Sequence, residues 1–302
     1  MPIPSHSDVI IIGGSYAGLS AAMALGRSLR KTLVIDSGSP CNRFTPHSHN
    51  FLTQDGKPPA EISTSARQQV AQYDTVRFYE GEVLGGTETD DGFAITTGSG
   101  DTFTGTKLIF ATGINDQLPE MPGFADCWGK SVIHCPYCHG YEFRGRKTGI
   151  LANGDRAFHL ASLVNNLTSD LSVVTNGQSH FTEEQTARLQ QRSIPIFESG
   201  IAGISHRDGQ IQNLVFDDGT VMLLEALYAS VPFVQHTDIP LTLGCDFNKQ
   251  GYIQVDEFQK TTVPGVFACG DNSSMMRSVA NAVATGNFTG AMVNRELTEE
   301  LF

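Results

Sequence analysis

The chain has 302 residues, of which 40% are hydrophobic and 17% are charged, as is typical of a globular protein with room for two domains. Its 32 acidic and 20 basic side chains give a formal net charge of -12, which disfavours nucleic acid and anionic membranes as partners. The sequence has no apolar run of about 18 residues and no basic, apolar leader, so we expect a cytoplasmic protein without a membrane span.

The first elements of the chain form a predicted β-α-β unit. Residues 8–13 (DVIIIG) predict a short buried strand that enters a glycine turn, residues 17–30 a helix, and residues 31–36 a second strand. Units of this kind place their two strands parallel, with the helix packed across one face of the sheet. We therefore expect a parallel α/β sheet in this part of the chain.

The next segment has the pattern of an antiparallel meander. Residues 83–107 alternate apolar and polar positions around turn signals such as the Asp-Gly pair at 91–92. A further apolar strand is expected at residues 107–111, immediately before a Thr-Gly pair.

A second β-α-β pattern starts near residue 146. Residues 147–152 predict a strand, residues 156–167 a helix, and residues 171–175 a strand. The remaining expected elements are a helix near 183–191, a hairpin-like stretch at 201–222, a strand at 226–231, short strands within 251–271 and a helix from about 279 to 297. The β-α-β unit is thus the internal repeat of the chain.

The loop between the first strand and the first helix, residues 13–18 (GGSYAG), is typical of a dinucleotide site. Gly13 allows a tight turn, Gly18 lets the helix pack on the strand, and Ser15 is small enough for the backbone to approach a pyrophosphate. The helix N-terminus adds N–H groups and a positive dipole end. Asp36 ends the second strand, where a carboxylate accepts hydrogen bonds from a ribose. A tight turn without a ligand is the alternative, and it explains Asp36 less well.

Several other short segments carry motifs. They are Ala111-Thr112-Gly113, residues 262–271 (TVPGVFACGD) with Gly270 and Asp271, Arg277-Ser278-Val279-Ala280, and Cys135-Pro136-Tyr137-Cys138. With these segments and the first loop, the chain resembles the thioredoxin reductase-like branch of the pyridine nucleotide-disulfide oxidoreductases over nearly its whole length. The resemblance implies that the loop, the ATG segment and the GD motif bind FAD, with Asp271 on the ribityl chain. It also implies that residues 278–280 lie beside the flavin ring.

The resemblance further implies the architecture. The fold class is α/β, with two Rossmann-like three-layer domains, the second inserted into the first, each with a small antiparallel meander. The FAD-binding domain is expected to comprise residues 1–116 and 245–302, and residues 117–244 are expected to form a nicotinamide-like domain that carries the cysteine pair. A homodimer and a domain rotation during turnover are also implied.

Cys135 and Cys138 form the one closely spaced pair among the six cysteines of the sequence. Two cysteines at this spacing can close a small disulfide ring at a helix start, where the dipole stabilises a thiolate. By the resemblance, Cys138 is the flavin-proximal thiol and Cys135 exchanges with the substrate. We therefore expect an FAD-dependent thiol–disulfide oxidoreductase whose partner is a thioredoxin-like protein or a small dithiol or disulfide.

Three other roles compete for the cysteine pair. Zinc usually needs two such pairs, and the adjacent His134 and His139 rarely converge on one ion, so no metal site is expected. The run from Cys135 to His139 also fits the C-x-x-C-H haem attachment motif, but no secretory signal accompanies it. A structural pair without redox chemistry is the third alternative.

His139 follows the pair directly, at a position where typical thioredoxin reductases have an acidic residue. An imidazole there can transfer protons near neutral pH, and a packing histidine is the alternative. The run of residues 139–142 (HGYE) is similar to a subset of the family whose members oxidise small dithiols with oxygen.

The second glycine loop departs from the family pattern. Residues 152–157 (ANGDRA) stand where the family has G-x-G-x-x-A, and Ala152 disfavours the tight turn if its φ is positive. Asp155 would place a negative charge near a pyrophosphate, partly offset by Arg156. Residues 175–180 contain no lysine or arginine to hold a 2′-phosphate.

Use of NADPH or NADH is therefore in question, and the sequence leaves the direction of electron flow open. The alternatives are an oxygen-dependent dithiol oxidase, a reductase fed by a donor other than NADPH, and a flavin-binding redox sensor that does not turn over.

Overall fold

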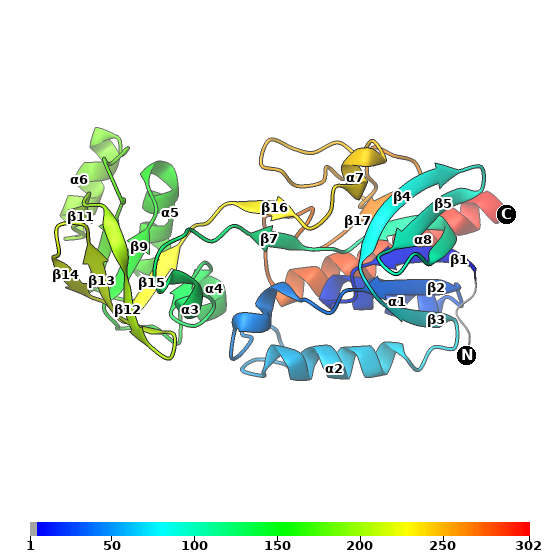
Figure 1. Cartoon of the computed structure of the whole chain (residues 1–302), viewed down its shortest axis with the longest axis horizontal. Helices are drawn as coiled ribbons and strands as arrows, with labels where there is room; N and C mark the ends of the chain where they lie inside the picture. The colour runs from blue at the N-terminus through cyan, green and yellow to red at the C-terminus, as the bar shows by residue number, and fades with distance from the viewer. Residues whose placement is uncertain (1–4) are drawn as a thin grey trace. The chain divides into compact units, whose positions relative to one another are not determined.

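The structure is a computed structural model that describes residues 5–302. The chain divides into two compact units (Figure 1). The first unit contains the chain up to Arg43, residues 50–115 and residues 233–302, and the second unit contains residues 44–49 and 116–232. The second unit is thus inserted into the sequence of the first.

A mixed sheet forms the centre of the first unit, in the order β3-β2-β1-β6-β5-β4, with β17 also paired to β6. The parallel strands are β1 (His6–Ile12), β2 (Thr32–Asp36), β3 (Val76–Glu80), β6 (Thr102–Phe110) and β17 (Val266–Ala268). An antiparallel meander is made by β4 (Val83–Thr89) and β5 (Gly92–Thr97), which leads into β6. The β-α-β unit and the meander predicted from the sequence are both present.

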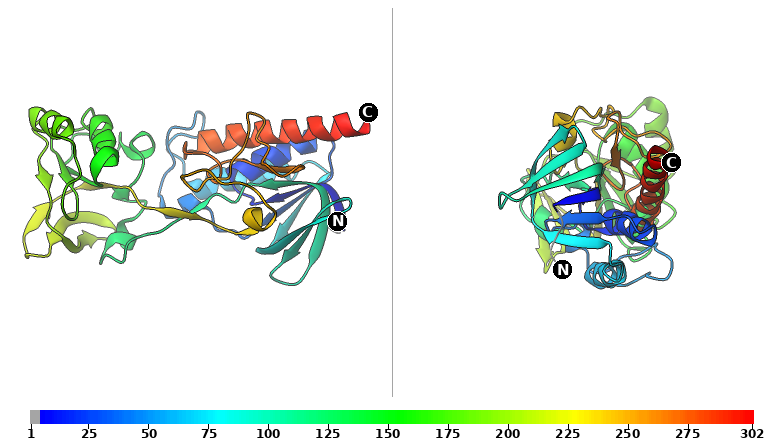
Figure 2. Two further views of the ribbon diagram at one scale, coloured as in Figure 1. Left: turned by 90° about the horizontal axis from the view of Figure 1, so that it is seen from above. Right: turned by 90° about the vertical axis from the view of Figure 1, so that its right-hand side faces the viewer.

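Successive side chains of β1 point to opposite faces of the sheet, so they lie in the two cores of this unit in turn. Val9 and Ile11 lie in one core with residues of α1 (Tyr16–Arg27), α2 (Pro59–Val70) and α8 (Val279–Leu301). Ile10 and Ile12 lie in the other core, with residues of the meander. α8 lies alongside α1 (Figure 2), and this contact is close because a Cβ at Gly286 would overlap the carbonyl oxygen of Ala17.

The second unit has a five-stranded sheet in the order β11-β10-β9-β15-β8, whose neighbours are all parallel. Its strands are β8 (Val132–Ile133), β9 (Thr148–Leu151), β10 (Leu171–Val174), β11 (Ile196–Phe197) and β15 (Ala226–Ala229). One face carries α5 (Gly154–Val164) and α6 (Glu183–Gln191). The other face carries α3 (Phe124–Cys127) and an antiparallel sheet of β12 (Ile201–Arg207), β13 (Gln210–Phe216) and β14 (Val221–Leu223). The predicted fold class is confirmed.

Two short strands, β7 (Ile114–Asp116) and β16 (Phe233–Gln235), pair with each other where the chain passes between the units. The chain returns from the second unit to the first between residues 232 and 233, whereas the predicted domain boundary lies between residues 244 and 245. The reason is α7 (Ile239–Thr242), since Ile239 is buried in the core of the first unit with residues of the meander. Burial of one isolated isoleucine leaves no periodic signal in the sequence.

Other elements differ from the sequence pattern. No element is predicted between residues 37 and 82, where the structure has η1 (Cys41–Phe44), α2 and β3. Residues 251–271 contain one strand, β17, beside isolated bridges, in place of several short strands. Within residues 5–302, no helix is long and apolar enough to cross a membrane.

Candidate active site

The first glycine loop makes a tight turn between β1 and α1. Gly13 has φ +105°, and a Cβ there would overlap the carbonyl oxygen of Ala111, at the end of β6. A Cβ at Gly18 would overlap the carbonyl oxygen of Gly13, so Gly18 allows the helix to lie on the turn. Both glycines therefore occupy positions at which other residues would be strained or would clash.

Asp36 lies against the same loop. Its Oδ1 accepts a hydrogen bond of 3.0 Å from the backbone N–H of Gly14, and a Cβ on Gly14 would lie 2.8 Å from the Cβ of Asp36. Ser15 caps α1 in an extended conformation without a side-chain hydrogen bond to the helix. The first turn of α1 is thus not capped by its own side chains, which suits a phosphate. Gly14 stands at a position where the glycine motif of dinucleotide sites accepts any residue. The sequence therefore does not identify it as a candidate site residue, although its N–H bonds to Asp36.

The GD motif is joined to the end of β6 by a buried amide. The side chain of Asn272 is fully buried, and its Nδ2 donates to the carbonyl of Phe110 at 2.9 Å and to Thr112 Oγ1 at 3.2 Å. Gly270 has φ +83°, and a Cβ there would lie 2.9 Å from the Cβ of Ala17 in α1. The structure therefore brings the first loop, the ATG segment and the GD motif together, as a single dinucleotide site requires.

The residues fit a dinucleotide cofactor. Because the Phe110 carbonyl can only accept, the amide of Asn272 has a fixed orientation, and its Oδ1 is buried without a hydrogen-bond partner among the described residues. A buried acceptor of this kind calls for a ligand hydroxyl or a water molecule. With the uncapped α1 and the carboxylate of Asp36, these groups could hold the phosphates and hydroxyls of FAD.

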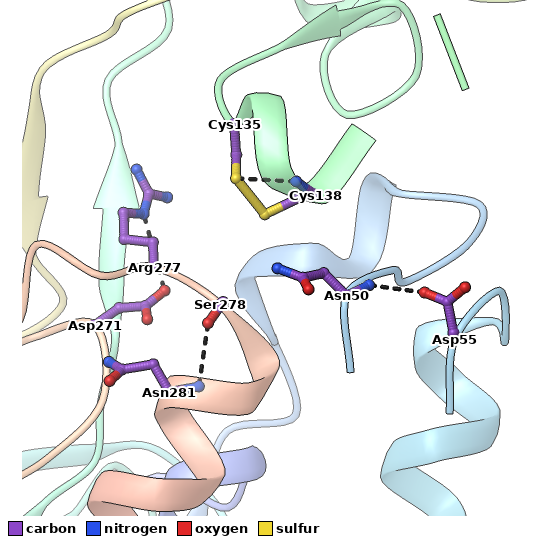
Figure 3. Close-up of a disulfide and its surroundings, with 8 residues drawn as sticks. All are labelled: Asn50, Asp55, Cys135, Cys138, Asp271, Arg277, Ser278 and Asn281. Atoms are coloured by element: carbon purple, nitrogen blue, oxygen red, sulfur yellow. Dashed lines mark hydrogen bonds and ion pairs between the residues drawn. A yellow bond between two sulfur atoms is a disulfide. The ribbon is translucent and has the colours of Figure 1, made fainter. Parts of the chain in front are cut away.

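The start of α8 contains the residues expected beside a flavin ring. Ser278 is the N-cap, and its Oγ accepts from the backbone N–H of Asn281 at 3.1 Å (Figure 3). Val279 and Ala280 form the first turn and are half-buried. Nearby, Arg277 Nε lies 3.8 Å from Asp271 Oδ2, so the carboxylate of the GD motif has a cationic neighbour (Figure 3).

In the second unit, Cys135 and Cys138 are joined by a disulfide with their Cα atoms 5.3 Å apart (Figure 3). Cys135 is the N-cap of α4 (Pro136–His139), and its Sγ accepts from the backbone N–H of Cys138 at 3.2 Å. Pro136 opens the helix, where the missing N–H is not needed. A hydrogen bond to sulfur at a helix start stabilises the thiolate form that disulfide exchange requires.

His139 lies at the end of α4 and is half-buried. Burial, and then the neighbouring His49, lower the pKa of His139 to about 4. The ring is therefore unprotonated at neutral pH and can accept a proton rather than supply one. The adjacent His134 stacks on Trp128, with ring centroids 5.9 Å apart. In the part of the chain that the structure describes, no group of three or more His, Cys, Asp or Glu residues could hold a metal ion.

In the second glycine loop, the side chain of Asn153 bonds to the backbone of the loop and of residues 178–180. Asn153 caps α5, and its Oδ1 accepts from the backbone N–H groups of Gly154 and His180, both at 2.8 Å. Its Nδ2 donates to the carbonyl of Gln178 at 2.8 Å. Within residues 152–157, the positive φ falls on Gly154, at +55°, and not on Ala152. The strain considered for Ala152 is therefore absent, because the turn has moved two residues along the chain.

Carboxylates surround the second glycine loop. Asp155 Oδ1 accepts from Gln185 Nε2 at 2.7 Å, which ties the first turn of α5 to the first turn of α6. Glu198 Oε1 accepts from the backbone N–H of Ser179 at 2.7 Å. The side-chain hydroxyl of Ser179, and then this backbone bond, lower the pKa of Glu198. The segment 175–180, in which the sequence analysis looked for a cation to hold a 2′-phosphate, thus has a carboxylate bonded to its backbone. Asn153 and Glu198 are residues whose role the sequence pattern did not show.

The chain matches the family described as Pyridine nucleotide-disulphide oxidoreductase over residues 7–286. It is 36% identical to a thioredoxin reductase of Claviceps purpurea, over 97% of this chain and 95% of the relative. A thioredoxin reductase of Aspergillus oryzae is 32% identical over 96% of each chain. Among solved structures, an oxidoreductase from Agrobacterium tumefaciens superposes with a TM-score of 0.91 at 38% identity, covering 97% of this chain and 99% of that one.

Proposed function

The chain belongs to the pyridine nucleotide-disulphide oxidoreductase family as a thioredoxin reductase-like enzyme, and we propose that it moves electrons between a dithiol and FAD through Cys135–Cys138. FAD binding is supported by the arrangement of the first loop, Asp36 and the GD motif in the first unit. When bound, FAD supplies a two-electron carrier. The disulfide supplies the group that reacts with the thiol substrate.

We propose further that electrons enter from a small dithiol and leave to oxygen. The observation that supports this direction is the cap of Asn153, whose Oδ1 accepts from the first N–H of α5, that of Gly154, and from the N–H of His180, so that the side chain stands where a pyrophosphate would approach the helix. The substrate dithiol loses two electrons and two protons and becomes a disulfide. Oxygen gains the two electrons and two protons and becomes hydrogen peroxide.

The cysteine pair and His139 perform the thiol steps. A substrate thiol gives its proton to the unprotonated His139 and attacks Cys135 Sγ, so that a substrate–Cys135 disulfide forms and Cys138 leaves as a thiolate. The second substrate thiol then loses its proton to solvent and attacks the substrate sulfur of that mixed disulfide, so that the substrate disulfide forms and Cys135 leaves as a thiolate. The N–H of Cys138 donates to the Cys135 sulfur and stabilises the charge released there.

A second candidate function is reduction of a thioredoxin-like protein by a donor other than NADPH. It is favoured by the names of the relatives from Claviceps purpurea and Aspergillus oryzae, both of which are called thioredoxin reductases. The two candidates share the cofactor and the disulfide, and they differ in the donor that reduces the flavin.

One anaerobic titration tests the proposal. The flavin absorbance of the purified holoenzyme is followed while NADPH, NADH or dithiothreitol is added in separate experiments. We expect rapid bleaching by dithiothreitol and slow or no bleaching by either nucleotide, followed by peroxide formation when oxygen is admitted. Rapid bleaching by NADPH at low concentration would overturn the proposed direction, and a protein that takes up no flavin would overturn the cofactor.

The homodimer and the cytoplasmic location stay predictions. Light scattering coupled to size-exclusion chromatography checks the first, because a dimer has twice the mass of the 32.6 kDa chain.

A further inference from the structure

Residues 44–49 belong to the second unit, although the chain on both sides of them belongs to the first. The segment packs on Gly129, where a Cβ would lie 3.1 Å from the Cβ of Phe44 and 3.3 Å from Thr45 Oγ1. Ser48 is buried at 6% exposure. These contacts fix the segment on the second unit, and they hold its last residue, His49, beside α4.

His49 contacts two groups near the disulfide. Its ring meets the ring of His139 edge-on, with centroids 6.5 Å apart and an interplanar angle of 87°. Its Nδ1 lies 3.6 Å from Glu142 Oε1, and the His49 side chain is only 20% exposed. His49 is thus in contact with both the ring of His139 and the carboxylate of Glu142.

Glu142 is held by the tight turn that follows α4. A Cβ at Gly140 would overlap the carbonyl oxygen of Pro136 and would lie 3.1 Å from Tyr228 Oη, in β15. Burial, and then the charge of Glu142, raise the pKa of Tyr228, which therefore remains a neutral phenol. The backbone at the start of this turn is thus packed closely between α4 and β15.

We propose that His49, in contact with Glu142, is a positioning residue that orients the His139 imidazole for the thiol that attacks Cys135. This inference rests on the proposed dithiol chemistry. In that step the substrate sulfur bonds to Cys135 Sγ, the Cys135–Cys138 bond breaks, and its electron pair leaves with Cys138. The proton of the thiol passes to His139.

The charges around His139 support this role. His139 shares α4 with Cys135 and Cys138, and its ring contacts His49 of the segment 44–49. His49 in turn contacts His47 and Glu142, and the charge of Glu142 acts on Tyr228 in β15. Burial, and then the neighbouring His49, lower the pKa of His139, so the contact between the two rings disfavours a protonated His139.

The test compares His49→Gln with wild type in the anaerobic reduction of the bound flavin by dithiothreitol, over a pH range that extends from below the pKa of His139 to mildly alkaline pH. We expect the rate at neutral pH to fall about ten-fold, since oriented proton transfer contributes to the step. We also expect the acidic limb of the rate profile to move toward neutral pH, because His49 lowers the pKa of His139 and its removal lets that pKa rise. His47→Gln is the matched control, since His47 is an exposed histidine of the same segment, and it should leave rate and profile unchanged.

If His49→Gln does not retain flavin, Glu142→Gln is the second variant that tests the role of His49. It should shift the pH profile of flavin reduction in the same direction as His49→Gln, but by a smaller amount. Wild-type rates and profiles in both variants would overturn the role of His49. An equal loss of rate at every pH would also overturn it, because that is the behaviour of a purely structural residue. If dithiothreitol fails to reduce even the wild-type flavin, the proposed dithiol function fails instead.

Discussion

The two glycine loops of this protein follow parallel strands of similar sheets, yet their helix N-termini are used differently. In the first unit, the start of α1 has no side-chain cap, and the nearest carboxylate, Asp36, bonds to the turn itself. In the second unit, Asn153 caps α5, and its Oδ1 also accepts a hydrogen bond from the backbone N–H of His180. An N-terminus can bind a phosphate or its own cap, but the same N–H groups cannot serve both.

The proposed function would require this chain to keep the fold of a thioredoxin reductase-like enzyme while the donor of its electrons differs. The second unit positions the Cys135–Cys138 disulfide and the histidine beside it. In that proposal, its strand-to-helix loop is a structural connection. The fold therefore persists because the loop still joins β9 to α5, whatever it binds.

The largest expected effect tests whether the second unit contributes thiol chemistry. Cys138→Ser should lower the anaerobic rate of flavin reduction by dithiothreitol at least about 10³-fold, because serine cannot form the disulfide. Cys127→Ala, at a buried cysteine of the same unit outside the disulfide, is the control and should retain the rate. A Cys138→Ser enzyme as fast as wild type would show that the flavin receives electrons by another route.

A paired substitution tests the claim that the first loop holds the cofactor. Gly13→Ala should weaken FAD binding about 100-fold or more, because φ of +105° strains alanine and its Cβ would overlap the Ala111 carbonyl. Ala152→Gly, at the corresponding position of the second loop, should leave flavin content unchanged. Fluorescence titration of the apoprotein with FAD measures both. An equal loss of FAD affinity in the two variants would contradict the claim that only the first loop holds the cofactor.

Asn153→Ala tests whether the second loop is structural. We expect the free energy of unfolding to fall by about 1 kcal/mol, as is usual for loss of an N-cap, with flavin reduction by dithiothreitol unchanged. Urea unfolding followed by circular dichroism measures the first quantity. Stability equal to that of wild type would mean that the cap contributes nothing, and a large loss of dithiol activity would contradict a purely structural loop.

The smallest expected effect concerns Glu198, whose pKa is lowered in the folded protein by its bond to Ser179. A lowered carboxyl pKa stabilises the fold above the unfolded pKa, and this stabilisation is lost as pH falls through the folded value. Glu198→Gln should therefore be slightly less stable than wild type at neutral pH and equally stable in acid. A stability difference that does not change with pH would show that the charge of Glu198 is irrelevant.

The sequence by itself determined the parts of this protein that depend on local periodicity and short motifs. Apolar runs and glycine turns predicted both β-α-β units, and the range of α6 is the one the pattern predicts. The spacing of Cys135 and Cys138 predicted a disulfide at a helix start, and Gly13 lies where a tight turn requires glycine. These signals are local because backbone geometry within a few residues produces them.

Tertiary structure decided what distant residues do together. Asn272 joins the GD motif to β6 across more than 150 residues, and His49 reaches His139 from a segment whose neighbours in sequence lie in the other unit. Asn153 is an ordinary polar residue in the sequence, and its role as a cap depends on where the backbone of His180 passes. Such contacts follow from the packing of whole elements, which no local pattern records.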